Sequence, residues 1–346
     1  MGTDGNGSRI RTILIDYRKA FDLIDHRILV HKLCNLNIPR SVVNWIINFL
    51  SDRFQRIKLA QDCYSDWGSV PSGVPQGTKL GPWLFILMIN DLRVSSPFLW
   101  KYVDDTTTSE IVQKGSVSNA QSLADEVICW SRINRVHINA DKCKELRITF
   151  AKQPVDFTPV VMEGKELEVV PSVKLIGLNI SHNLTWNKQV DEVLNKAGKR
   201  LYFLVQLKRA KVPPMDLIIF YKACIRSVSD YAIPAYFHAL PKYLKNEIIR
   251  LEKRALAIIL PGTNYRTACK VLSLTPIEEH HIKLCGNLFS DIVSDSKHKL
   301  HHLLPPLKDS NYSLRRKSRF SVPRVQTNRT KQSFLITMTT QCIICP

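Results

Sequence analysis

The hydrophobic pattern of the first fifty residues predicts one strand followed by two helices. Residues 9–17 are largely apolar and β-branched, which is typical of a short buried strand, and Asp16 lies at its carboxyl end. Over 25–53 apolar residues recur at helical spacing, with a break at Pro39. We therefore expect two consecutive helices after the strand.

The next segments predict two hairpins with a helix between them. Residues 55–70 have a hairpin-like pattern. Gly81 and Pro82 suit the start of a helix, because proline is tolerated at the first helical position, and the apolar run after them predicts a helix buried on most faces. Asp104 and Asp105 lie in a weakly alternating segment, as the tip of a tight hairpin would.

Further along the chain, the pattern predicts a helix, a strand and a junction. Ser118 and Gln121 form a candidate capping box at the start of the helix. Residues 144–151 predict the strand. Residues 151–182 suggest short strands that join two domains.

Beyond residue 182 the apolar period becomes helical and stays helical, which predicts an α-helical domain. From about Lys297 the chain is polar, basic and interrupted by prolines, so we expect poor order there. Basic residues lie off the apolar stripes of the helical domain; they are Lys196, Lys199, Arg200, Lys253 and Arg254. The predicted organisation is a first domain over 1–150, a strand-rich junction over 151–182, a helical domain over 183–262 and a basic C-terminal region over 263–346.

Composition excludes several classes of protein. The 346 residues are 45% hydrophobic and 23% charged, which is usual for folded proteins. The longest apolar stretch is too short to cross a bilayer, and the first ten residues lack the apolar core of a signal peptide. Nine cysteines without an export signal favour reduced thiols inside the cell. Cys342 and Cys345 form one Cys-x-x-Cys, which is a weak zinc signal; two incidental cysteines are the simpler interpretation.

Positive charge is concentrated in the second half of the chain. The net charge is +19, and residues 196–346 hold 26 of the 49 Lys and Arg residues but nine of the 30 Asp and Glu residues. This imbalance predicts that the C-terminal half meets a polyanion. A basic surface that only keeps the protein in solution is the alternative if no chemistry points to nucleic acid.

Three aspartates are candidates for a divalent cation site. Asp16 at a strand end and Asp104 and Asp105 in a hairpin would converge if their elements are neighbours in one sheet. Clustered carboxylates repel one another unless cations neutralise them, and Mg²⁺ prefers such oxygen ligands completed by substrate phosphates. Two ions roughly 3.5–4 Å apart would serve an in-line phosphoryl displacement. Each aspartate taken singly is more often solvated or a backbone cap.

Four segments resemble successive motifs of reverse transcriptases, in the family's order. They are Asp16-Tyr-Arg-Lys-Ala-Phe-Asp22, the stretch from Ser72 to Leu92, Tyr102-Val-Asp-Asp105 and, in looser form, Asn139-Ala-Asp-Lys142-Cys. The sequences of these motifs are more similar to those of non-LTR (LINE-type) retrotransposon enzymes than to those of retroviral enzymes. The resemblance covers residues 9–265 and implies an α+β fold, with a right-hand palm of antiparallel sheet and packed helices followed by an α-helical thumb.

The resemblance implies catalytic roles for four residues. Asp16 and Asp104 would ligate two Mg²⁺ ions, for which Mn²⁺ could substitute, and Asp105 would support them. A primer 3′-hydroxyl would attack the α-phosphate of a dNTP. Lys142 could neutralise or protonate the departing pyrophosphate, although a solvated lysine is the simpler interpretation.

Contacts with substrate and template are implied for five more residues. The backbone carbonyl of Tyr17 would be a further metal ligand. Phe21 would clash with a 2′-hydroxyl and so select deoxyribonucleotides, whereas residue type alone fits a core phenylalanine equally well. Gln76 and Gly77 would let the backbone lie against a base pair and the RNA template, or form a simple turn, and Tyr102 would pack beneath the end of the DNA primer. The basic helical region would hold the RNA–DNA duplex by its phosphates.

The start of the sequence leaves two hypotheses of different classes. Fifteen residues precede Asp16, so we expect neither a fingers subdomain, which holds the triphosphate in this family, nor an upstream endonuclease. In the first, the chain is an RNA-directed DNA polymerase. In the second, it is a catalytically inactive truncated remnant or a co-opted nucleic-acid-binding protein. Positioning of the substrates provides most of the rate enhancement in phosphoryl transfer. Since the triphosphate contacts of a fingers subdomain are not expected here, we expect weak or undetectable polymerisation.

Other members of the polymerase class fit the motifs less well. Phe21 disfavours an RNA-dependent RNA polymerase. Group II intron maturases and telomerase have motif sequences that fit this chain less well. The family implies residence in the nucleus. The basic run Arg315–Arg319 is a weak localisation signal, or simply a solvated tail. No membrane partner is expected.

Overall fold

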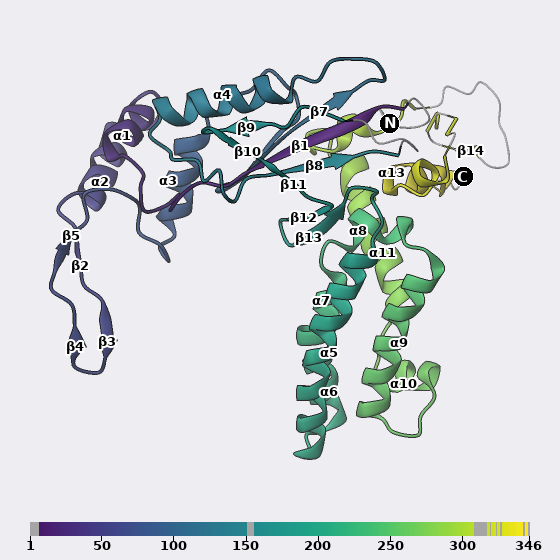
Figure 1. Cartoon of the computed structure of the whole chain (residues 1–346). Helices are drawn as coiled ribbons and strands as arrows, with labels where there is room; N and C mark the ends of the chain where they lie inside the picture. Colours follow the sequence, from purple (N-terminus) through teal and green to yellow (C-terminus); the bar gives the residue numbers. More distant parts are fainter. Residues whose placement is uncertain are drawn as a thin grey trace. The chain divides into compact units, whose positions relative to one another are not determined.

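The chain folds into two compact units, which are described separately. The computed structural model describes residues 7–150, 156–307, 317–318, 320–322, 324–325, 327–341 and 343–344. The sheet unit is Asn6–Ser172, and the helical unit comprises Val173–Pro346 (Figure 1). The boundary between them falls inside the predicted junction.

A five-stranded sheet forms the centre of the sheet unit. Its strands are β1 (Arg9–Ile15), β6 (Leu99–Tyr102), β7 (Asp105–Val112), β8 (Lys144–Ile148) and β11 (Glu168–Val169). In the order β11-β8-β1-β7-β6, the central strand β1 is antiparallel to both of its neighbours.

The expectation of a purely antiparallel sheet is wrong at one edge, where β11 runs parallel to β8. The chain leaves β8 and forms a small hairpin of β9 (Val161–Met162) and β10 (Lys165–Glu166) before it enters β11. This connection returns the chain to the end of the sheet where β8 begins, so the two strands share one direction.

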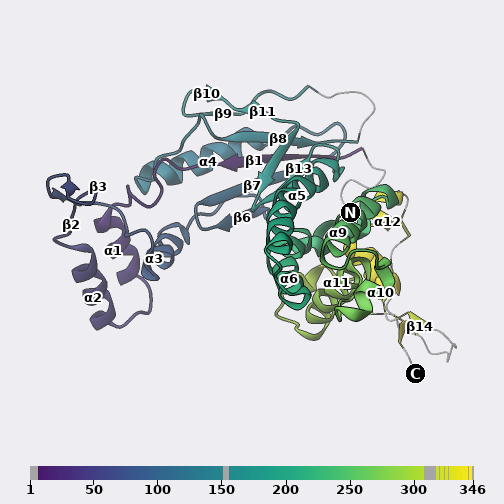
Figure 2. The ribbon, with the colours of Figure 1, turned by 90° about the horizontal axis from the view of Figure 1, so that it is seen from below.

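Helices cover one face of this sheet. Residues of β1 alternate in burial, and Ile13 and Ile15 point into the main core. Helices α3 (Leu80–Ile89) and α4 (Ala120–Ile133) contribute to that core, and α4 contacts β1 and β7 (Figures 1 and 2). Most of α3 is buried, as predicted, although Trp83 is 65% exposed.

Two helices and an exposed pair of hairpins lie between β1 and α3. Helices α1 (His26–Cys34) and α2 (Arg40–Leu50) are separated at Pro39, as predicted, and the Asp25 side chain caps α1. The predicted hairpin region is also confirmed. It consists of β2 (Phe54–Gln55), β3 (Lys58–Ala60), β4 (Cys63–Tyr64) and β5 (Gly68–Ser69), with β2 paired to β5 and β3 to β4.

The predicted capping box at α4 is wrong. Asn119 is the residue before the helix, and its side chain makes no capping hydrogen bond. The Ser118 hydroxyl donates to Glu110 instead, and the Gln121 amide donates to Asp125 and to a backbone carbonyl. The Ser118 hydroxyl does accept from the Ala120 amide at 3.3 Å, but the reciprocal bonds between Ser118 and Gln121 that a capping box requires are absent from the described contacts.

The helical unit begins with a two-stranded sheet and continues as packed helices. Most residues of the predicted apolar stripes lie in two cores. Apolar residues of α10 and α11, beyond residue 262, complete these cores. The larger elements are β12 (Ser172–Leu175), β13 (Leu178–Ser181), α5 (Asn187–Arg209), α6 (Pro214–Phe220), a π-helical turn (Tyr221–Arg226), α7 (Ser227–Asp230), α8 (Ile233–Tyr236), α9 (Lys242–Ile259), α10 (Tyr265–Val271) and α11 (Ile277–Ser294). Short 3-10 turns lie at Phe237–Ala239 and His301–Leu303.

Part of the C-terminal region is regular. It contains β14 (Lys317–Ser318), α12 (Asn328–Lys331), α13 (Phe334–Gln341) and β15 (Ile343–Ile344). Ile336 of α13 is buried, and α13 contacts α8 and α11. The expectation of poor order in the C-terminal region stays a prediction. Cys342 and Cys345 lie outside the described residues. None of the described helices is long and apolar enough to span a membrane.

A buried carboxylate holds four parts of the helical unit together. Glu252 of α9 is fully buried and accepts hydrogen bonds from the hydroxyls of Tyr221 (2.9 Å) and Tyr265 (2.5 Å) and from the Ile277 amide (2.8 Å). The buried Arg226 guanidinium lies 3.9 Å from it. These partners satisfy the carboxylate inside the core and connect α9 to the π-helical turn, α10 and α11.

A second buried charge lies in the central sheet. Arg11 of β1 donates from Nε to Glu145 of β8 at 2.7 Å, and both side chains are almost completely buried. Arg147 donates to the same carboxylate at 2.8 Å. Burial pushes the pKa of Glu145 upward, but the hydrogen bonds and charges of the two arginines outweigh this and lower the pKa.

Glu145→Gln should lower the free energy of unfolding by about 3–5 kcal/mol, because it leaves the buried Arg11 charge unpaired. Since the folded-state pKa of Glu145 lies below its unfolded value, this contribution is complete above the unfolded pKa and is lost as pH falls through the folded one. Urea unfolding at neutral and at acidic pH measures both effects. Glu166→Gln, at an exposed carboxylate of β10, is the matched control, and an equal loss in both variants would contradict the assignment.

Candidate active site

Strand pairing brings three aspartates to one end of the sheet. Asp16 follows β1 directly, Asp104 lies in the turn between β6 and β7, and Asp105 begins β7. Ile15 pairs with Thr106, so the same register continued by one residue places Asp16 opposite Asp105. Residues that face each other across a pair of strands project to the same face of the sheet.

The turn that carries Asp104 is strained. Val103 has a φ of 55°, in the left-handed region that a β-branched residue rarely adopts. The pairing of Tyr102 with Asp105 closes this turn. Strain of this kind often occurs at functional sites, where the surrounding structure stabilises it.

The negative charges of the three aspartates act on one another. Partial burial raises the pKa of Asp105, and the charges of Asp104 and Asp16 raise it further. A positive charge at this place would relieve the repulsion. The pKa shift therefore supports a site for a cation.

Asp16 is fixed by two residues that follow α4. The Asn139 side chain donates from Nδ2 to Asp16 Oδ2 at 3.0 Å, and its backbone amide donates to the Asp16 carbonyl at 2.8 Å. The Asp16 amide donates to the Cys143 sulfur at 3.3 Å, and burial raises the pKa of this thiol to about 11. We assigned no role to these residues from sequence, although both belong to the fourth motif.

The donor chemistry of the site fits a hard divalent cation. Carboxylate oxygens are the ligands that Mg²⁺ prefers, and at least two of them project to one face. Within the described ranges, no group of three or more His, Cys, Asp and Glu side chains is already arranged to hold a metal. The fit of a divalent cation to this site therefore rests on the carboxylate donors and on the mutual repulsion of the three aspartates.

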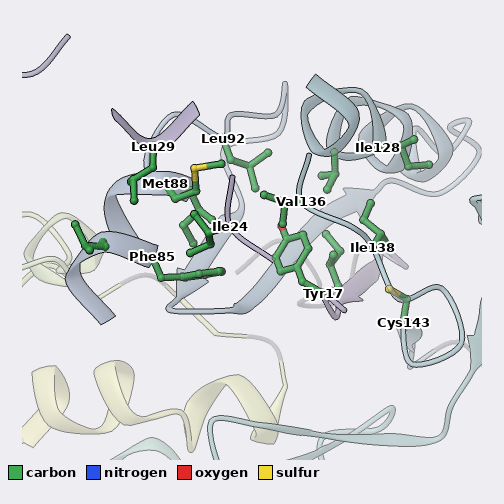
Figure 3. Packing of buried hydrophobic residues seen from close by; sticks show 14 of the residues in the cluster. Tyr17, Ile24, Leu29, Phe85, Met88, Leu92, Ile128, Val136, Ile138 and Cys143 are labelled. Carbon is green, nitrogen blue, oxygen red and sulfur yellow. The ribbon is translucent and has the colours of Figure 1, made fainter. Parts of the chain in front are cut away.

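Tyr17 and Phe21 pack against the core beside the aspartates. The Tyr17 ring is buried next to Val136 and Ile138, and burial raises its pKa to about 12 (Figure 3). Its side chain is thus part of the core, so only its backbone could reach a substrate. Phe21 is half-buried and stacks on Phe85, with ring centroids 5.0 Å apart.

A loop rich in glycine and proline is bonded to the segment after Asp16. The Val74 amide donates to the Phe21 carbonyl at 2.7 Å, and the Gln76 side chain donates to Asp22 at 3.0 Å. Gly73 has a φ of 80°, and a Cβ there would lie 2.5 Å from the Asp22 carbonyl oxygen, so this approach requires glycine. We assigned no role to Asp22 or Gly73 from their sequence context, although both lie in the first two motifs.

The remaining predicted site residues are on the surface. Gly77 also has a φ of 80° and has open space around its α-carbon. Tyr102 is 60% exposed on the edge strand β6, on the face of its partner Asp105. Lys142 is exposed in the turn after Asn139 and donates its backbone amide to the Asn139 carbonyl.

Comparison with known proteins identifies two matching families. Residues 4–180, slightly more than half of the chain, match the family described as reverse transcriptase (RNA-dependent DNA polymerase). The short segment 186–227 matches the N-terminal family of alkylated DNA repair protein alkB homolog 8, which is too small a part of the chain to show membership.

Several curated proteins are similar over most of this chain. The RNA-directed DNA polymerase from mobile element jockey of Drosophila melanogaster is 25% identical over 258 residues, which cover 70% of this chain and 27% of that protein. The probable RNA-directed DNA polymerase from transposon BS of the same species is 23% identical, covering 77% of this chain and 31% of that protein. The chain thus spans between a quarter and a third of the length of these relatives.

Among solved structures, telomerase from Candida tropicalis in complex with a fragment of telomeric RNA gives a TM-score of 0.37 at 11% identity. The similarity covers 80% of this chain and 49% of that chain. The strand-end aspartates and the glycine-rich loop lie within the matched residues 4–180, and this chain belongs to the reverse transcriptase family, in which it is similar to the polymerases of non-LTR retrotransposons.

Proposed function

We propose that this chain carries the catalytic centre of an RNA-directed DNA polymerase of a non-LTR retrotransposon. The observation that carries the proposal is the register of β1 and β7, which brings Asp16 opposite Asp105 beside Asp104. In this proposal the sheet unit is the palm and the helical unit is the thumb.

The aspartates would act in transfer of a nucleotide to a primer 3′-hydroxyl. Asp16 and Asp104 would hold two divalent ions, Mg²⁺ or as a substitute Mn²⁺, with support from Asp105. When bound, these ions supply charge neutralisation and a more acidic primer hydroxyl. Asn139 keeps the Asp16 carboxylate in one orientation, which lowers the cost of ordering it in each cycle.

Three residues near the aspartates would position the incoming dNTP and the template. Phe21 would exclude a 2′-hydroxyl, since its stacking on Phe85 limits its movement. Gln76, held by Asp22, and the exposed Gly77 would lie along the base pair and the template strand.

Two further predicted contacts concern the primer and the pyrophosphate. Tyr102 would support the primer end, because its exposed ring shares a sheet face with Asp105. Lys142 is exposed and could reach a departing pyrophosphate.

The helical unit offers the charge that a nucleic acid duplex needs. Lys196, Lys199, Arg200, Lys253 and Arg254 are all exposed on α5 and α9. Contacts of such residues to phosphates carry no sequence information, so they would bind an RNA–DNA duplex of any sequence.

Primer extension tests the proposed activity. With a poly(rA)/oligo(dT) duplex, Mg²⁺ and dTTP, we expect weak incorporation by the parent chain and a loss of about 100-fold or more in the Asp104→Ala/Asp105→Ala double variant, because the cation ligands are removed. If neither protein incorporates dTTP but both bind the duplex with a steep salt dependence, the chain is a polymerase remnant that binds nucleic acid.

Asp105→Asn tests the cation site without reference to catalysis. In EDTA the variant should melt about 1–2 °C above the parent, because removing a partly solvated like-charge contact is worth less than about 1 kcal/mol. Mg²⁺ should raise the melting temperature of the parent more than that of the variant. Asp125→Asn, at an exposed aspartate of α4, is the control. Equal responses of all three proteins to Mg²⁺ would contradict the site.

Phe21→Val tests the sugar selection. We expect the ratio of rUTP to dTTP incorporation to rise about tenfold or more, because the smaller side chain leaves room for a 2′-hydroxyl. Phe49→Val is the control, since Phe49 also packs against the core and stacks on an aromatic ring, in α2. An unchanged ratio in Phe21→Val would remove this role.

A further inference from the structure

The hairpins between α2 and the glycine-rich loop form an exposed arm, residues 53–70. Ser65 joins the two pairs of strands, because its amide donates to the Ile57 carbonyl at 2.9 Å and its hydroxyl accepts from the Ile57 amide at 2.8 Å. Figure 1 shows the arm extending beyond α2 in the sheet unit. It exposes a dense set of large apolar side chains, namely Phe54, Ile57, Leu59, Tyr64 and Trp67.

This exposure is unusual for so short a segment. Single exposed apolar residues are ordinary, but a contiguous group of them marks a binding surface. A two-stranded hairpin also gains little stability by itself in water. The arm is therefore better explained by a ligand than by its contribution to the core.

One face of the arm combines arginine with aromatic rings. The Arg56 guanidinium carbon lies 4.1 Å from the ring centroid of Tyr64 and 4.8 Å from that of Trp67. Lys58 pairs with Tyr64 across β3 and β4, and its Nζ lies 5.4 Å from the same ring. We call these four residues the arm face. Within the described part of the chain, neither Arg56 nor Lys58 forms an ion pair.

Such a face suits single-stranded nucleic acid. Unpaired bases stack on aromatic rings and on guanidinium planes, and the positive charges hold the phosphates between the bases. Binding of a protein partner would explain the exposed apolar residues, but it would not explain why two cations lie over the same aromatic rings. The charge and the rings together favour nucleic acid.

A pocket is lined by the base of the arm and the glycine-rich loop. It has a volume of about 490 Å³, and its lining includes Arg53, Gln55, Gly73 and Gln76. Nη1 of Arg53 is buried without a hydrogen-bond partner. Asp22 also lines the pocket, but it already accepts from Gln76. A buried donor without an acceptor is costly. Arg53 lines the pocket, where a phosphate would accept charge-assisted hydrogen bonds from its guanidinium.

We propose that the pocket and the arm face hold the uncopied, single-stranded part of the RNA template as it approaches Gln76. This inference rests on the proposed function, because it extends the template contact of Gln76 outward. Arg53 binds a phosphate in the pocket. Arg56, Tyr64 and Trp67 stack on bases further along the arm, without preference for sequence.

Fluorescence anisotropy with the full chain tests the inference. The probes are a labelled single-stranded RNA of about 16 nucleotides and a blunt RNA–DNA duplex. The arm variant Arg56→Gln/Tyr64→Ala/Trp67→Ala should bind the single strand about tenfold or more weakly, and Arg53→Gln about threefold or more weakly. Binding of the blunt duplex should change less than about twofold, because the arm face meets unpaired bases.

Two controls make the result specific. Arg40→Gln/Trp45→Ala removes an exposed cation and an exposed indole from α2 and should bind both probes like the parent. Tyr64→Phe/Trp67→Phe keeps the stacking surface and should retain single-strand binding. Circular dichroism melting confirms that each variant is folded.

Several outcomes would overturn the proposal. Unchanged single-strand binding by the folded arm variant would do so. An equal loss for both probes would show a general charge effect instead. A change of oligomeric state in sedimentation, with RNA binding intact, would assign the arm to a second copy of the chain.

The proposed activity and the arm proposal can be contradicted independently of each other. A parent chain without incorporation still allows the binding measurement, whereas an active parent whose arm variant binds single strands normally contradicts only the arm proposal.

Discussion

The antiparallel pairing of β1 with β7 and β8 is the constraint on which the sheet unit depends. Side chains alternate along a strand, so a shift of one residue would turn Asp16 away from Asp105 and move Ile13 and Ile15 out of the core. The apolar face therefore selects the register, and the register places the carboxylates. The buried pair of Arg11 and Glu145 reinforces it, because both charges would be unpaired in any other alignment.

The proposed active site combines rigidity with unfavourable charge. Asp16 is held by Asn139 and Cys143 at the end of a buried strand, and Asp105 lies where its negative charge is opposed by two others. Such a place costs stability in the absence of a cation. The surrounding core, with the Tyr17 ring packed directly beneath the site, supplies the stability that lets the charges remain together.

The glycine-rich loop links this charged centre to the rest of the sheet unit. Gly73 allows the loop to lie against the Asp22 backbone, and Gln76 and Arg53 both line the pocket beside that contact. The arm continues from there as a surface with little packing of its own. In the helical unit the opposite holds, since its helices share cores and the buried Glu252. The basic residues named above on α5 and α9 remain exposed there.

The local elements and the chemical groups of the site follow from the amino-acid sequence alone. Helical periods predicted α1, α2, α5 and α9, the apolar run after Gly81 and Pro82 predicted α3, and the spaced motifs identified Asp16, Asp104 and Asp105. These signals depend on neighbours along the chain. Long-range packing sets the parallel edge strand β11, the bond from Ser118 to Glu110 and the bond from Asn139 to Asp16, which is 123 residues away. Those choices arise when distant segments compete for the same donors and acceptors, and a local pattern carries no record of that competition.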